Sequence, residues 1–146
     1  MANIVIASDD QLCQSAMNWF VKHQKCVNDT AKIDTLKDGE KFYIIAHDIE
    51  LGDASQLIEY MSQFDFPMEA DFMIVLIVCS AHTLNFTQGL VTPAEAIANH
   101  FQRNVYASKT LVYGRWSDDG AASFTGDYLT VTPNTDIESL FEKLKI

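Results

Sequence analysis

Residues 72–78 constrain the fold of this chain more than any other segment, because every position of the run Phe-Met-Ile-Val-Leu-Ile-Val is apolar. A half-exposed strand alternates apolar and polar residues, whereas a strand that is buried on both faces does not. Such strands lie at the centre of parallel sheets that helices cover on both sides. The apolar run ends at Cys79 and is too short to span a bilayer. It therefore predicts a central strand of an α/β sheet.

Strands and helices are expected to alternate along most of the 146 residues. The further expected strands are residues 4–7, a weak strand at 31–36, 42–46 and 105–107. Helices are expected from Asp9 and Asp10 to about His23, after Gly52-Asp53, after Thr92-Pro93 and from Thr135 onward. Residues 111–116 and 124–131 flank a turn at Asp118-Asp119-Gly120 and predict a β-hairpin. The pattern predicts one domain over residues 1–146, a layered α/β fold with a mainly parallel sheet and a C-terminal hairpin.

The composition narrows the range of partners. Twenty Asp and Glu residues stand against ten Lys and Arg, which gives a net charge of −10. Nucleic acids and anionic membranes bind basic surfaces, so neither is expected as a partner. Three cysteines without paired spacing and a start without a basic segment predict a reducing compartment, no signal peptide and a cytoplasmic location. The six glycines form no phosphate-binding motif, so no cofactor is expected.

Two residues with catalytic side chains follow strongly predicted strands. His47 follows the strand at residues 42–46, and Cys79 follows the strand at 72–78. Functional groups gather at the carboxyl ends of strands in open α/β sheets. A thiolate is a nucleophile, and a nearby histidine can serve as its base. If the two strands are neighbours, His47 and Cys79 can form a dyad; the alternative is that they are an ordinary buried thiol and a polar residue at a strand end.

The order of the segments carries a resemblance to a known family. The segments are Ile-Val-Ile-Ala-Ser-Asp-Asp at 4–10, Lys22-His23, Asp38-Gly39, Phe-Tyr-Ile-Ile-Ala-His at 42–47, Ile-Val-Leu-Ile-Val-Cys-Ser at 74–80, Pro-Ala-Glu-Ala-Ile-Ala at 93–98 and Val-Tyr-Ala-Ser at 105–108. This order resembles the caspase-like cysteine protease domains of large bacterial toxins, which process their own polypeptides and belong to the clan CD peptidases. The resemblance extends to about Thr110 and implies a bacterial origin, with delivery as a toxin-like effector as a further possibility.

The resemblance implies a fold, an activity and a site. The fold is a three-layer caspase-like α/β sandwich, and the activity is cleavage of peptide bonds in a protein or peptide substrate. His47 matches the catalytic histidine and Cys79 the nucleophile, with the backbone N–H groups of Asp48 and Ser80 near the oxyanion. The family usually has glycine where Asp48 stands, so a catalytically lapsed, protein-binding member is the alternative. Its activator, inositol hexakisphosphate, is not expected here because the chain is acidic.

Other polar residues offer further candidates. His82, Trp116, Asp118 and Asp119 are candidates for the substrate cleft, and Asp127 joins the two aspartates as a candidate for an acidic specificity pocket. Trp116 can instead pack across the hairpin, and the aspartates can simply be solvated.

Two competing sites use overlapping residues. Cys79, His82, His47 and Asp48 have the ligand types of a zinc site, although one short pair is a weak signal, and no metal is expected. Asp9, Asp10, Asp48, Ser80 and Lys109 have the residue types of a phospho-accepting receiver domain with a magnesium pocket. Capping of the first helix is the simpler explanation of Asp9 and Asp10.

Overall fold

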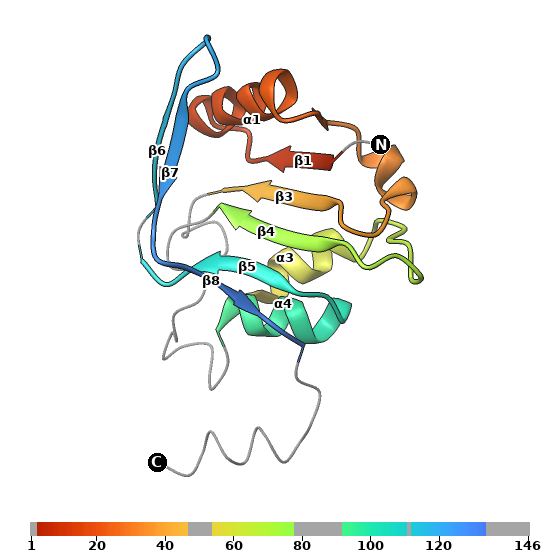
Figure 1. Cartoon of the computed structure of the whole chain (residues 1–146). Coiled ribbons are helices and arrows are strands. Elements are labelled where there is room, and N and C mark those ends of the chain that lie inside the picture. Colours follow the sequence, from red (N-terminus) through yellow and green to blue (C-terminus); the bar gives the residue numbers. More distant parts are fainter. Residues whose placement is uncertain (1–2, 47–53, 78–91, 111, 134–146) are drawn as a thin grey trace.

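A six-stranded, mostly parallel sheet organises the computed structural model, which describes residues 3–46, 54–77, 92–110 and 112–133. The strand order is β2-β1-β3-β4-β5-β8 (Figure 1). The strands are β1 (Asn3–Ala7), β2 (Cys26–Val27), β3 (Lys41–Ile45), β4 (Met73–Ile77), β5 (Val105–Ser108) and β8 (Tyr128–Val131). Neighbouring strands are parallel except for β8, which runs antiparallel to β5. The predicted α/β class with a mainly parallel sheet is confirmed.

Strand β4 lies within the sheet, between β3 and β5, and is buried on both faces. Ile74 and Leu76 are completely buried in the apolar core on one face. Val75 and Ile77 belong to a second core on the other face. Because each face needs apolar side chains, the sequence of this strand has no polar alternation, which confirms the predicted central strand over the described residues Met73–Ile77.

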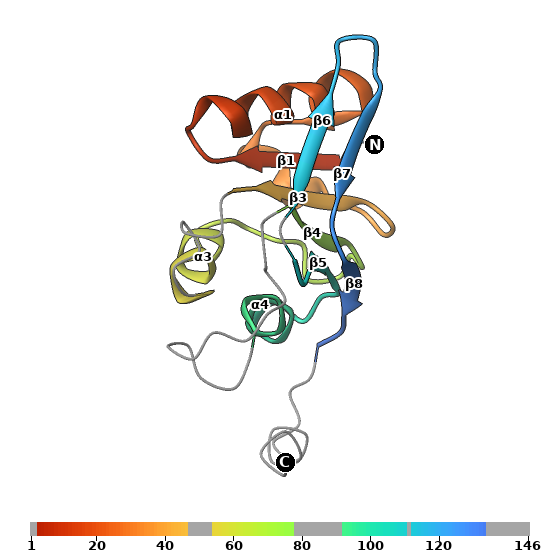
Figure 2. The same cartoon turned by 90° about the vertical axis from the view of Figure 1, so that its left-hand side faces the viewer.

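Helices cover both faces of the sheet (Figures 1 and 2). Helix α1 (Gln11–His23) covers one face, and its Phe20 ring lies 4.8 Å from the ring of Tyr43 on β3. Helices α3 (Ala54–Met61) and α4 (Pro93–Phe101) cover the other face. Among the described residues, no helix is long and apolar enough to cross a membrane.

Capping residues fix where two of these helices begin. The carboxylate of Asp10 accepts a hydrogen bond from the backbone N–H of Cys13. Thr92 and Glu95 form a reciprocal capping box, with Pro93 at the first position of α4. These side chains satisfy backbone donors that have no partner inside the helix, so the predicted starts of both helices are confirmed.

Strands β6 (Tyr113–Trp116) and β7 (Ala122–Thr125) form a separate antiparallel hairpin, which the sequence predicted. The hairpin passes the carboxyl ends of the parallel strands and reaches α1 (Figures 1 and 2). The N–H groups of Ser117 and Gly120 donate to the carbonyls of Ala121 and Ser117, respectively. Gly120 has a φ of 103°, which only glycine adopts readily, so it closes the turn without strain.

Two sequence predictions are wrong. Residues 31–36 are not a strand, because Asp29 caps a 3-10 helix, η1 (Thr30–Thr35), whose one buried side chain is Ile33. Residues 124–131 are not one strand, because β7 ends at Thr125 and β8 then joins the main sheet. A Cβ atom built on Gly126 would lie 2.7 Å from the hydroxyl of Ser108, so only glycine lets the chain turn so close to β5. The helix expected from Thr135 lies outside the described residues.

Candidate functional site

The strands that precede the two candidate catalytic residues are neighbours in the sheet. β3 and β4 pair in parallel, with Ile45 opposite Ile77. The pairing continues one residue further, because the N–H of Ala46 donates to the carbonyl of Ile77 at 3.3 Å. His47, Asp48, Cys79, Ser80 and His82 lie outside the described residues. The two strands are therefore neighbours, as a dyad of His47 and Cys79 requires. The dyad itself stays a prediction.

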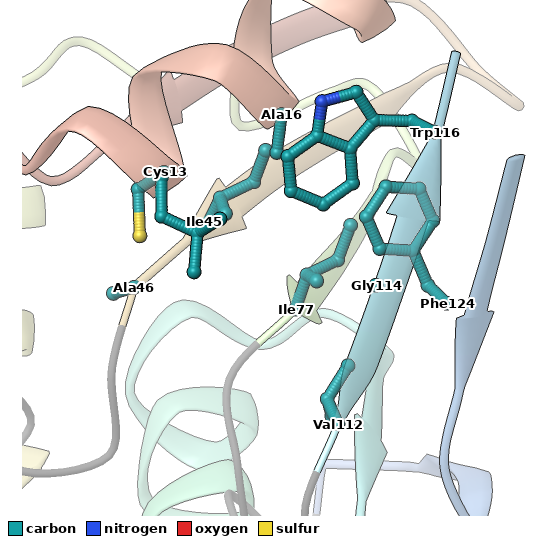
Figure 3. Close-up of a pocket in the computed structure, with 10 residues that line it drawn as sticks. Cys13, Ala16, Ile45, Ala46, Ile77, Val112, Gly114, Trp116 and Phe124 are labelled. Carbon is teal, nitrogen blue, oxygen red and sulfur yellow. The ribbon is translucent and has the colours of Figure 1, made fainter.

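An apolar pocket lies beside the carboxyl ends of β3 and β4 (Figure 3). Its volume is about 80 Å³. The lining residues come from the start of α1, the ends of β3 and β4, and the hairpin: Leu12, Cys13, Ala16, Ile45, Ala46, Ile77, Val112, Gly114, Trp116 and Phe124. In α/β proteins this edge of the sheet is where ligands bind. The pocket is therefore the candidate binding feature that the described residues provide.

Aromatic side chains hold the hairpin against α1. The rings of Trp116 and Phe124 stack with centroids 5.8 Å apart and planes 12° apart. The indole N–H of Trp116 donates to the hydroxyl of Ser15 on α1 at 3.0 Å. Phe124 also lies 5.3 Å from Phe20, which is buried in the core beneath α1. These contacts make the hairpin wall of the pocket continuous with the hydrophobic core.

The structure separates the substrate-cleft candidates from one another. Trp116 lines the pocket and also stacks across the hairpin, so both of its expected roles are compatible with its position. Asp118 and Asp119 are exposed in the hairpin turn and do not line the pocket. A hydrogen bond from the Ser117 hydroxyl, with another from the N–H of Ala121, lowers the pKa of Asp119. These hydrogen bonds stabilise the hairpin turn, so the role that the structure gives Asp119 is to hold that turn.

The remaining carboxylates have similar local surroundings. Asp127 is exposed at the base of the hairpin, where its N–H donates to Ser108 and Thr110. Asp10 caps α1, as the simpler explanation held. Within the described part of the chain, no three His, Cys, Asp or Glu side chains are placed to hold a metal ion. The zinc and receiver alternatives both depend on residues outside that part.

The two described cysteines have the surroundings of packing residues. Cys13 and Cys26 are both buried. Burial raises the pKa of the Cys26 thiol to about 11, so this thiol is protonated at neutral pH. A thiol is a poor nucleophile compared with a thiolate. Cys26 is therefore a packing residue, and it suits the role of an internal control for the reactivity of Cys79.

Sequence reasoning did not single out several pocket residues, among them Leu12, Ala16, Gly114 and Phe124. The available signal is the Gly-x-Trp spacing in β6 opposite a phenylalanine in β7, since residues two apart in a strand share a face. That spacing shows which side chains share a face but not which helix the face meets.

No protein-family model matches this chain, and comparisons with curated protein sequences and with solved structures found no match either.

Proposed function

We propose that this protein is a caspase-like cysteine peptidase in which Cys79 is the nucleophile and His47 is the general base and acid. The observation that carries the proposal is the pairing of Ile45 with Ile77 in adjacent parallel strands. His47 and Cys79 each follow these paired residues by two positions in the sequence. The offset from the paired strands is therefore the same for both residues, which is what a dyad across a strand pair requires.

General strand geometry turns this equal offset into an expected site. Neighbouring strands lie about 4.8 Å apart, and residues two apart in a strand point to the same face. Ile45 and Ile77 both face the pocket. Extending the strand pattern by two residues would place the imidazole and the thiol side by side on this same face. Parallel strands β2-β1-β3-β4-β5, an antiparallel β8 and helices on both faces also suit the resemblance to the caspase-like family.

The proposed chemistry is acyl transfer followed by hydrolysis. His47 takes the proton of the Cys79 thiol, and the thiolate sulfur attacks the carbonyl carbon of the scissile peptide bond. The N–H groups of Asp48 and Ser80 would stabilise the oxyanion. The C–N bond then breaks, and the amine leaves with the proton from His47. Water cleaves the resulting thioester and regenerates the thiol.

The test is the rate at which iodoacetamide alkylates each cysteine across pH, followed by mass spectrometry. We expect Cys79 to react rapidly below about pH 7 and to lose this reactivity in His47→Ala, because an imidazolium beside the sulfur keeps a thiol ionised at a pH where an ordinary thiol is protonated. His100→Ala is the matched control, since His100 is exposed on α4. Cys13 and Cys26, both buried, report any loss of structure. A Cys79 that reacts slowly and independently of His47 would contradict the proposal.

A further inference from the structure

Described helices cover only one face of the sheet over strands β5 and β8. On the α4 side, alternate residues of these strands pack in the apolar core: Val105, Ala107, Leu129 and Val131. The residues between them point to the opposite face of the sheet. Figure 2 shows α3 and α4 on one side of β4, β5 and β8, and no described helix on the other side. Helix α1 lies further along the sheet, over β1 (Figure 1).

Aromatic side chains occupy the face of β5 and β8 that α4 does not cover. Tyr106 lies between Val75 of β4 and Thr130 of β8 in the strand register. Val75 belongs to the core beneath α1, so Tyr106 and Thr130 lie on that side of the sheet. The rings of Tyr106 and Tyr128 stack with centroids 5.1 Å apart and planes 8° apart. Tyr106 is 37% exposed, and Thr130 is exposed. We call Tyr106, Tyr128, Thr130 and the half-buried Met73 the open face.

The segment that follows β8 has an apolar stripe of its own. Residues 135–146 read Thr-Asp-Ile-Glu-Ser-Leu-Phe-Glu-Lys-Leu-Lys-Ile and lie outside the described residues. Apolar side chains recur at three- and four-residue spacing, which is the pattern of one helix face. We call these residues the C-terminal stripe: Ile137, Leu140, Phe141 and Leu144. A short amphipathic helix is stable only when its apolar stripe packs against another element.

We propose that residues 135–146 form a helix that docks on the open face through the C-terminal stripe. The occupant is a segment of this same chain, and the proposal does not depend on the proposed catalytic residues. The helix runs back along β8 and places its stripe over the stacked rings of Tyr106 and Tyr128. Both rings then lose contact with water, and this burial of apolar surface stabilises the docked helix.

Three observations favour the open face as the docking position. β8 ends at Val131, so only residues 132–134 separate it from the helix, and short connections keep consecutive elements adjacent. The other face of β8 already packs against α4, with Val131 in that core. A helix over residues 135–146 is about 18 Å long, at about 1.5 Å per residue. The four residues of β8 span about 13 Å, so such a helix covers the whole strand.

Alkylation of an engineered cysteine tests whether the open face is covered. The full chain carrying Thr130→Cys reacts with iodoacetamide, and mass spectrometry follows position 130. We expect Leu140→Asp with Phe141→Asp to speed this reaction at least tenfold, because carboxylates in the C-terminal stripe prevent its burial. Ser139→Asp adds a charge outside the stripe and should leave the rate unchanged. Equal rates in the three proteins would overturn the inference.

Two comparisons separate docking from other causes of protection. Ser123→Cys, at an exposed position on β7, should react at the same rate with and without the two aspartates. Cys26 is buried and should stay slow in every variant, which shows that the fold is retained. Protection of position 130 that increases with protein concentration would show that a second copy covers the face, which contradicts docking within one chain.

A double-mutant cycle identifies the docking face without introducing charge. Tyr106→Ala and Leu140→Ala are made separately and together, and the urea midpoints are recorded. We expect the shift of the double variant to be smaller than the sum of the single shifts, since both changes remove the same contact. Tyr60→Ala is the matched control, because Tyr60 is 46% exposed on α3, and its shift should add to that of Leu140→Ala. Additive shifts in both pairs, or coupling of Leu140 to Tyr60 instead, would refute docking on the open face.

Discussion

Replacing Ser108 by alanine should destabilise the junction where β5, the hairpin and β8 meet. Ser108 is completely buried at the end of β5. Its hydroxyl donates to the carbonyl of Thr110 at 3.0 Å and accepts from the N–H groups of Thr110 at 3.1 Å and Asp127 at 3.2 Å. The same hydroxyl thus joins the segment that enters the hairpin to the segment that leaves it.

The size of the effect follows from counting these bonds. Each hydrogen bond contributes about 1 kcal/mol net, and an unsatisfied buried group costs about 1–3 kcal/mol. The N–H of Asp127 keeps a second acceptor in the hydroxyl of Thr110, at 3.1 Å, and Thr110 itself is exposed enough to meet water. We therefore expect Ser108→Ala to lower the free energy of unfolding by about 2 kcal/mol, which is less than the sum over all of its hydrogen bonds and the groups left unsatisfied.

Urea denaturation followed by circular dichroism measures this loss. With a slope of about 2 kcal/mol per molar urea, the midpoint should fall by about 1 M. Ser123→Ala is the matched control, since Ser123 is exposed on β7, and its midpoint should remain within about 0.25 M of the wild type. If Ser108→Ala behaves like this control, the hydroxyl does not stabilise the junction and the reasoning from the bond count is wrong.

Three further predictions concern other parts of the fold. Thr92→Ala removes the capping box of α4 and should lower the free energy of unfolding, measured in urea, by about 1 kcal/mol. Thr92→Ser keeps the hydroxyl and should retain most of that stability. Gly39 has a φ of 81° and open space around a Cβ, so Gly39→Ala should lower the free energy of unfolding in urea by about 1 kcal/mol through backbone strain alone. Gly39→Asn should lower it by less, because asparagine tolerates a positive φ better. Burial raises the pKa of Cys26 to about 11, whereas an unfolded thiol ionises near pH 8.5. Stability should therefore be complete below that pH and fall by an amount on the order of 2 kcal/mol toward pH 11, and a Cys26→Ala protein that shows the same slope would contradict this.

The central sheet could be predicted from the sequence because a strand that is buried on both faces consists of apolar residues. β4 has no polar residue since both of its faces are covered, and Asp10 and Thr92 mark helix starts through their own side chains. The turn at Gly120 is equally local, because a positive φ favours glycine. Each of these features is decided within a few residues of the chain, where propensity and pattern apply directly.

The features that sequence reasoning missed depend on distant partners. Whether the chain continues past Thr125 as one strand is decided by Gly126, which packs against Ser108 on another strand. The pocket likewise forms where Ala16 of α1, Ile77 of β4 and Gly114 of β6 come together. These residues are far apart in the chain, and no local pattern shows that they meet.

The walls of the pocket come from two parts of the fold that are held by different contacts. The register of β3 and β4 is fixed by their pairing with each other within the main sheet. The hairpin contributes Gly114, Trp116 and Phe124 to the pocket, yet it belongs to a separate sheet that is joined to the main one at Ser108 and Gly126. We therefore expect substitutions in the hairpin to alter the shape of the pocket while the pairing of β3 with β4 is retained.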